Sequence, residues 1–162
     1  MIVVADTSPL HYLVLIGSVD VLKPLYHSVV VPQAVAGELQ HAAAPDSVRS
    51  WIAQPPDWCE IRADVRSDPS LEFLGLGERA AIGLALSLDA DRLLIDEWEG
   101  RTEAERRYLH VTGTLGVLAE AHNQNLLDFE AAFARLRQTT FYVSATLIAS
   151  IRRQLFAGRG DI

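Results

Sequence analysis

Near its N-terminus the chain reads Ile2-Val3-Val4-Ala5-Asp6-Thr7-Ser8-Pro9-Leu10. A short apolar run that ends in turn residues is typical of a buried parallel strand, which here covers residues 2–5. Pro9 favours the opening of a helix, and we expect Ser8 to be the N-cap of that helix. The helix should continue to Gly17, where a glycine favours helix termination. The stretch therefore predicts a strand followed directly by a helix, with Asp6 between them.

The same strand-then-helix pattern recurs along the chain. Val29-Val30-Val31-Pro32 is followed by a helix that contains Glu38, and Gly75-Leu76-Gly77-Glu78 opens a helix that is apolar on nearly every side and therefore buried. The capping-box spacing of Thr102 and Glu105 predicts another helix start. Further strands are expected at 58–62, 92–95 and 110–112, and further helices at 47–52, 114–124, 128–138 and 144–155. This alternation predicts a single α/β domain over residues 1–162, with a central parallel sheet of about four to five strands covered by helices on both faces.

Composition excludes several classes of protein. Of 162 residues 49% are hydrophobic, which excludes a disordered chain, and 14 Lys and Arg against 21 Asp and Glu give a net charge of −7, which argues against a generally cationic nucleic-acid binder. A signal peptide and a membrane span are not expected. Cys59 is the one cysteine, and it shows no zinc-ligand spacing with the five histidines. We therefore expect a cytoplasmic protein without a disulfide or zinc.

Acidic residues follow the strands that should lie together. Asp6 follows the first strand, and Asp96 and Glu97 follow the strand at 92–95. Because ligands of parallel α/β sheets bind outside the carboxyl ends of the strands, these side chains should face one crevice, joined by Glu38 and Glu78. Carboxylates this close repel one another unless protons or a cation neutralise them, and all-oxygen ligands favour Mg²⁺ or Mn²⁺.

Each acidic residue also has an ordinary structural explanation. Asp6 could cap the helix that follows it, and Glu78 could interact with the dipole of its own helix. Glu38 could simply face solvent, and Asp96 and Glu97 could be turn residues. The functional interpretation therefore depends on the joint placement of all of them.

The motifs together resemble the PIN-domain family, and more narrowly a branch close to the VapC-type toxins of toxin–antitoxin pairs. The matching segments span nearly the whole chain in order: Val-Val-Ala-Asp6-Thr7-Ser8-Pro-Leu, Val-Val-Pro-x-x-Val-x-x-Glu38-Leu, Leu-Gly-x-Gly-Glu78-x-x-Ala-Ile, Leu-Leu-Ile-Asp96-Glu97-x-x-Gly100-Arg101 and Thr112-Gly113-Thr114-Leu-Gly116-Val-Leu. The resemblance implies a three-layer α/β/α sandwich and a cytoplasmic endoribonuclease that uses Mg²⁺ or Mn²⁺.

The resemblance also implies roles for individual residues. The family's acidic quartet maps onto Asp6, Glu38, Glu78 and the Asp96/Glu97 pair, which would hold the metal and activate a water that hydrolyses an RNA phosphodiester bond. Substrate contacts are expected from Ser8 and Arg101, with Arg106 and Arg107 as further phosphate ligands or, alternatively, ordinary surface arginines. A VapC-like toxin would form a homodimer and bind a small antitoxin protein.

Two alternatives compete with a nuclease. The third acidic position, commonly Asp in the toxins, is Glu78, and the residue after Asp96, often Asp in this branch, is Glu97. These departures, with the aromatic residues Tyr12, Trp51, Trp58 and Trp98, also fit a catalytically silent PIN-like module that binds a partner protein, although ordinary core packing explains such aromatics as well. A receiver-like phosphoacceptor domain fits poorly, because its late lysine is absent.

Overall fold

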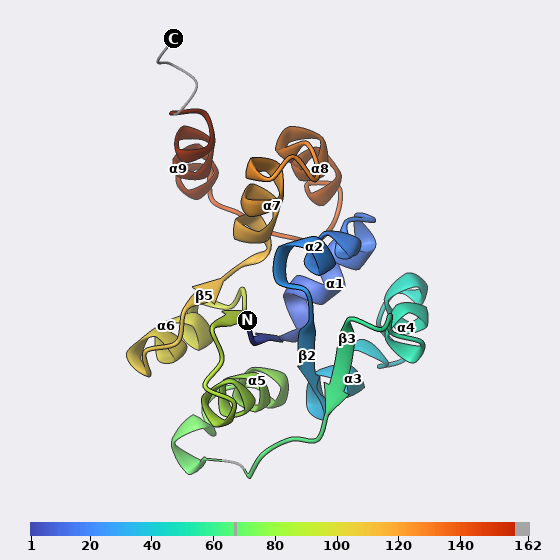
Figure 1. The fold of residues 1–162 in the computed structure, drawn as a ribbon, viewed down its shortest axis with the longest axis vertical. Coiled ribbons are helices and arrows are strands. Elements are labelled where there is room, and N and C mark those ends of the chain that lie inside the picture. The colour runs from blue at the N-terminus through green and yellow to red at the C-terminus, as the bar shows by residue number, and fades with distance from the viewer. Residues whose placement is uncertain (67, 158–162) are drawn as a thin grey trace.

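A computed structural model describes residues 1–66 and 68–157 (Figure 1). Five strands form one sheet in the order β3-β2-β1-β4-β5, and all four pairs of neighbouring strands are parallel. The α/β fold with a central parallel sheet is therefore confirmed, with five strands. The prediction of one domain also covers residues 67 and 158–162, which lie outside the described part of the chain.

The strands are short and all are joined through helices. They are β1 (Val3–Ala5), β2 (Val29–Pro32), β3 (Cys59–Arg62), β4 (Arg92–Leu94) and β5 (Val111–Thr112). The α-helices are α1 (Thr7–Leu15), α2 (Leu22–Tyr26), α3 (Gln33–Leu39), α4 (Asp46–Ala53), α5 (Leu76–Ser87), α6 (Trp98–Arg106), α7 (Thr114–Asn123), α8 (Phe129–Leu136) and α9 (Ala145–Phe156). Short 3₁₀ helices are η1 (Val19–Val21) and η2 (Pro69–Leu71).

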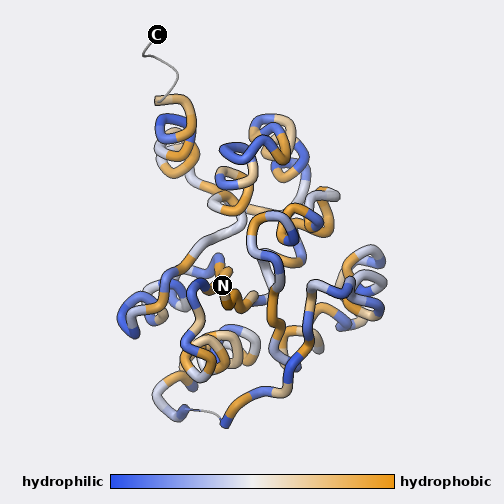
Figure 2. Tube along the Cα trace, in the orientation of Figure 1, coloured by the Kyte–Doolittle hydropathy of each residue, from blue (hydrophilic) through white to orange (hydrophobic). Residues whose placement is uncertain are grey.

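Alternation of side chains along the strands divides the interior into two hydrophobic cores. Val3 and Ala5 of β1 face the core formed with α1, α2, α3, α4, α7, α8 and α9, whereas Val4 faces the core formed with α5 and α6. Figure 2 shows the hydrophobic residues along the central strands. Both faces of the sheet are covered, so the strands are apolar on both sides, as a parallel sheet requires.

The order of the strands fixes where a ligand can enter. From β1 the chain adds β2 and β3 on one side of the sheet, and then returns to add β4 and β5 on the other side. The carboxyl ends of β1 and β4, paired through Ala5 and Leu94, therefore lie at the point where the direction of winding reverses. Open α/β sheets bind their ligands in the crevice at such a point.

The starts of two helices differ from the sequence-based expectation. Helix α1 begins at Thr7 with Asp6 in the N-cap position, so the prediction of Ser8 as N-cap is wrong. Pro9 is tolerated at the third helical position, because the amides of the first turn have no intrahelical partner. Thr102 does not start a helix either: α6 already begins at Trp98, and the Thr102 hydroxyl donates to the Trp98 carbonyl at 2.8 Å.

Candidate active site

Asp6 is the most deeply buried acidic residue of the site. Its backbone N–H donates to the Leu94 carbonyl at 2.9 Å, which extends the pairing of β1 with β4 by one residue. The residue is 2% exposed, and its side chain makes no capping hydrogen bond to α1. The Oδ1 atom is buried without a hydrogen-bond partner. Helix capping therefore does not explain Asp6, because a buried carboxylate oxygen without a partner is costly.

Burial raises the pKa of Asp6 from 3.8 to about 7, against the opposing effect of the Thr7 amide. The charges of Glu78, Glu38 and Asp96 raise it further. A carboxyl group with this pKa is about half protonated at neutral pH when no cation is present. The charge effects of Glu78, Glu38 and Asp96 on Asp6 place all three acidic residues near it, in the crevice expected from the sequence.

Glu38 reaches the site from the end of α3 and is held by two donors. The Thr7 hydroxyl donates to Oε2, and the Gly77 amide donates to Oε1 at 2.9 Å. Gly77 lies in the first turn of α5, where a Cβ atom would stand 2.5 Å from Glu38 Oε2. A glycine is therefore what allows the carboxylate to approach the N-terminus of α5, whose free amides favour a negative charge.

Glu78, in α5, and Asp96, which follows β4, complete the acidic group. Burial, followed by the charges of Glu97 and Glu38, raises the pKa of Glu78 in the first turn of α5. The pKa of Asp96 is also raised by burial, although Thr114 opposes the rise by donating from its amide to Oδ1 and from its hydroxyl to Oδ2, both at 2.7 Å. Asp96 is thus fixed by the start of α7.

The remaining predicted residues border a pocket that begins at Asp96. Glu97 is exposed at the N-cap position of α6, and Ser8 is half-buried in the first turn of α1; both line this pocket with Arg101. The positive charge of Arg101 lowers the pKa of Asp96, and its guanidinium donates to the Ile95 carbonyl at 3.4 Å. The seven residues of the predicted site therefore lie near one another: Ser8, Asp96, Glu97 and Arg101 line the pocket, and Asp6 interacts electrostatically with Glu38, Glu78 and Asp96.

Residues that hold the carboxylates were missing from the sequence-based site. Thr114 supplies both donors to Asp96, and Gly77 supplies the amide to Glu38. Gly113 has no room for a side chain, since a Cβ atom would lie 2.6 Å from an Arg101 guanidinium nitrogen and 2.8 Å from Asp96 Oδ1. The sequence signal that could have identified these positions is a glycine at a helix start: Gly77 lies in the first turn of α5, and Gly113 directly precedes α7.

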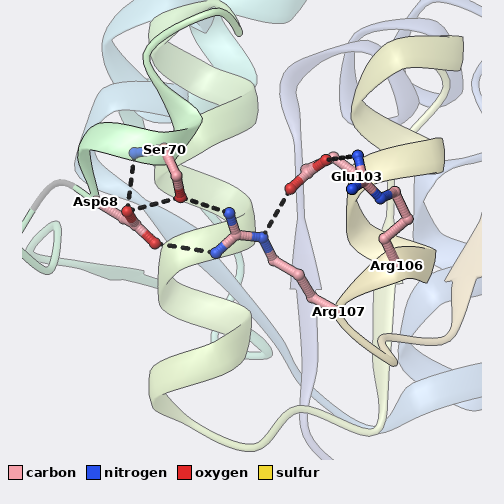
Figure 3. Close-up of polar contacts among 5 residues, drawn as sticks. All are labelled: Asp68, Ser70, Glu103, Arg106 and Arg107. Atoms are coloured by element: carbon pink, nitrogen blue, oxygen red, sulfur yellow. Dashed lines mark hydrogen bonds and ion pairs between the residues drawn. The ribbon is translucent and has the colours of Figure 1, made fainter.

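Arg106 and Arg107, considered as phosphate ligands, have acidic partners elsewhere. Arg107 lies between two segments (Figure 3): it bonds Asp68 at 2.9 Å and Ser70 at 2.6 Å on one side and Glu103 at 3.0 Å on the other. Arg106 pairs with Glu103 at 3.3 Å. The structure thus favours the ordinary explanation for both, and Arg107 fastens the segment before α5 to α6.

The chemistry of the donor set suits a hard divalent cation, although the carboxylates do not form a ready-made cage. Across residues 1–66 and 68–157, no group of three or more His, Cys, Asp or Glu side chains is arranged to hold a metal ion. The oxygens present are nevertheless those that Mg²⁺ and Mn²⁺ prefer, and the unpartnered Oδ1 of Asp6 is an acceptor that lacks a ligand. The donor chemistry of these residues therefore fits a hard divalent cation.

Three of the aromatic residues considered for partner binding are packed against the core. Tyr12, Trp51 and Trp58 are partly buried there, and the Trp51 and Trp58 rings lie 6.0 Å apart. Trp98, in contrast, is 76% exposed. Ordinary packing therefore accounts for the first three, and Trp98 remains unexplained by the fold.

Known protein families and solved structures include relatives of this architecture. The family model DUF3368, described as a PIN domain, matches residues 2–156. A PilT N-terminus domain protein from the hyperthermophilic archaeon Sulfolobus solfataricus P2 has a similar fold, with a TM-score of 0.51 and 13% identity over 89% of this chain and 100% of that one. No curated protein matches the sequence. In the described part of the chain no helix has the length and apolar character needed to cross a membrane. The chain belongs to the DUF3368 family of PIN domains.

Proposed function

We propose that the protein is an endoribonuclease that depends on Mg²⁺ or Mn²⁺ and hydrolyses RNA phosphodiester bonds. PIN domains are typically nucleases, and this supports the general class of reaction. The observation that carries the proposal is the buried Oδ1 of Asp6, which has no partner and lies among three other carboxylates at the carboxyl ends of β1 and β4. Such an arrangement is costly for a protein that never binds a cation there.

The proposed ligands of the ion are Asp6 and Asp96, with Glu38, Glu78 and Glu97 binding directly or through water. The chemistry that the ion supplies when bound is activation of water and neutralisation of the charge that develops on the scissile phosphate. Thr114 holds Asp96, and Thr7 and Gly77 hold Glu38, so these two carboxylates are oriented before an ion binds.

Two residues are proposed to position the substrate. Arg101 forms no salt bridge within the described part of the chain, and it stands next to Asp96, where a guanidinium can contact a phosphate oxygen. Ser8 lines the same pocket and can donate its hydroxyl to the RNA backbone. Neither Arg101 nor Ser8 transfers a proton in the proposed reaction.

The experiment is cleavage of single-stranded and structured RNA by the purified protein in Mn²⁺, Mg²⁺ or EDTA. Asp6→Asn should abolish cleavage, whereas Asp57→Asn, a matched change at an exposed turn, should not. Products should carry a 5′-phosphate, because the attacking group is water. A contaminating metal-independent ribonuclease would instead leave cyclic phosphates and would remain active in EDTA. Cleavage that persists in Asp6→Asn or in EDTA would contradict the proposal.

The finer assignment is that the nuclease is the toxin of a toxin–antitoxin pair, a homodimer inhibited by a small antitoxin protein. Resemblance of the acidic and glycine motifs to VapC-type toxins supports it. Induction of the protein in a bacterial host should arrest growth, and the product of a short neighbouring gene should relieve the arrest. If growth is unimpaired although the protein is an active nuclease, the toxin assignment is wrong and a housekeeping ribonuclease is favoured instead.

A further inference from the structure

A pocket of about 850 Å³ extends from the acidic site along one side of the molecule. It is bordered by α1, α6, β5 and α7 on the side of the sheet and by residues 140–142 and α9 on the other side. We call this pocket the flanking groove; its lining includes Ser8, Asp96, Arg101, Phe141, Tyr142 and Leu147. Because Asp96 and Arg101 belong to both, a chain bound at the acidic site would continue directly into the groove.

Two aromatic side chains at the groove are far more exposed than packing requires. Trp98, at the start of α6, is 76% exposed, and Tyr142, in the segment before α9, is 86% exposed. Flat rings that face solvent beside a groove can stack on the bases of a single strand, because every base has an apolar face. Phe141, next to Tyr142 in the lining, is half-buried and packs edge-on against Tyr12 at 5.0 Å between ring centroids.

The charges of the groove are arranged unevenly. Asp96 and Glu97 lie at the end next to the acidic site, together with the cationic Arg101. Glu120 also lines the groove, but its charge is paired with Arg92, and the Tyr26 hydroxyl donates to it at 2.7 Å. The far end, at residues 140–142, Leu147 and Ile151, has no acidic lining residue. Nucleotides could therefore occupy that end without facing a carboxylate.

We propose that the flanking groove binds the unpaired nucleotides next to the scissile bond of a single-stranded RNA, with Trp98 and Tyr142 as stacking surfaces. The inference deepens the proposed nuclease function and rests on it. Arg101 contacts the phosphate where the strand leaves the acidic site, and the rings hold the bases that follow. A duplex, whose bases are stacked inside the helix, cannot use these rings, so the groove selects single strands.

Binding can be measured apart from cleavage. Fluorescence anisotropy of a labelled single-stranded RNA, titrated with the full-length protein in EDTA, should show about tenfold weaker binding for Trp98→Ala and for Tyr142→Ala, the loss expected for one stacked base. Tyr142→Phe, which keeps the ring, should bind as the wild type does. Tyr108→Ala is the matched control, since Tyr108 is 94% exposed but does not line the groove. Unlabelled RNA duplex should compete poorly.

The result that would overturn the inference is wild-type RNA affinity in both alanine variants, or a duplex that competes as well as the single strand. If instead the alanine variants alter sedimentation of the protein while RNA binding is unchanged, the groove is a contact between copies, and the inference is also wrong. Ring-dependent RNA binding without any cleavage in Mn²⁺ would contradict the proposed nuclease but not the groove. Cleavage in Mn²⁺ together with RNA binding that does not depend on the two rings would contradict the groove but not the proposed nuclease.

Discussion

Replacing Asp6 with asparagine should make the metal-free protein more stable at neutral pH, although it should also remove activity. The carboxylate is buried, its Oδ1 has no hydrogen-bond partner, and three other acidic side chains raise its pKa. Asparagine is nearly the same size and carries no charge at any pH. The substitution therefore removes a buried negative charge without creating a cavity.

The size of the effect follows from the shift in the pKa. The folded-state pKa of about 7 lies above the ordinary value of 3.8, so ionisation of Asp6 opposes folding as the pH rises between these values. The loss is about 1.4 kcal/mol per pH unit and reaches about 4 kcal/mol above pH 7. The stability gained by Asp6→Asn should therefore grow from low to neutral pH, up to a few kcal/mol on this order-of-magnitude scale.

Urea denaturation in EDTA, repeated between about pH 4 and pH 8, measures the difference in unfolding free energy between the two proteins. Asp57→Asn, at an exposed turn, serves as the control and should show no comparable pH dependence. A difference between Asp6→Asn and the wild type that stays constant with pH, or a loss of stability at pH 8, would refute the reasoning.

Other expected outcomes concern the ion, the glycine beside Glu38 and the ion pair of Figure 3. Adding Mn²⁺ should raise the melting temperature of the wild type, because a ligand that binds only the folded state stabilises it; unchanged melting at millimolar Mn²⁺ would contradict the site. Gly77→Ala should lower RNA cleavage at least about tenfold, since the added Cβ displaces the Glu38 carboxylate. Little stability should be lost, because alanine favours the helix. Gly37→Ala, whose Cβ would meet no atom within 4 Å, is the control. Hydrogen bonds from Ser70 and Arg107 lower the pKa of Asp68 to about 2, so the destabilisation caused by Asp68→Asn should fade as the pH falls from about 4 towards 2, and a pH-independent effect in urea titrations would argue against it.

Local patterns were sufficient to predict the strands and most of the helices but not the order of the strands. Runs such as Val29–Val31 and the proline after them identify a strand and a helix from neighbouring residues alone. Pairing of β1 with β4 joins residues that are far apart in the chain, and no local pattern encodes it. Helix α2 was not predicted from the sequence; Pro24 lies in its first turn, where proline is tolerated.

The acidic residues were predictable for a related reason. Asp6 and Asp96 follow strands, and the carboxyl ends of parallel strands meet at one edge whatever the strand order. The partners of these carboxylates were not predictable. The roles of Thr114 and Gly77 depend on two helix starts being brought against Asp96 and Glu38, which is set by packing of whole helices on the sheet. The N-cap at Ser8 was wrong because a proline is compatible with several positions of a first turn.

The position of β1 in the middle of the sheet has a consequence for how the site is lost. The amide of Asp6 is bonded to the Leu94 carbonyl, and β1 is paired with a strand on each side. Exchange of that amide hydrogen with solvent therefore requires opening of the central sheet, which in a small protein approaches global unfolding. Fraying at the ends of the chain leaves Asp6 and Asp96 side by side. The acidic crevice is thus either assembled or absent, and partial unfolding should not yield a nuclease with a half-formed site.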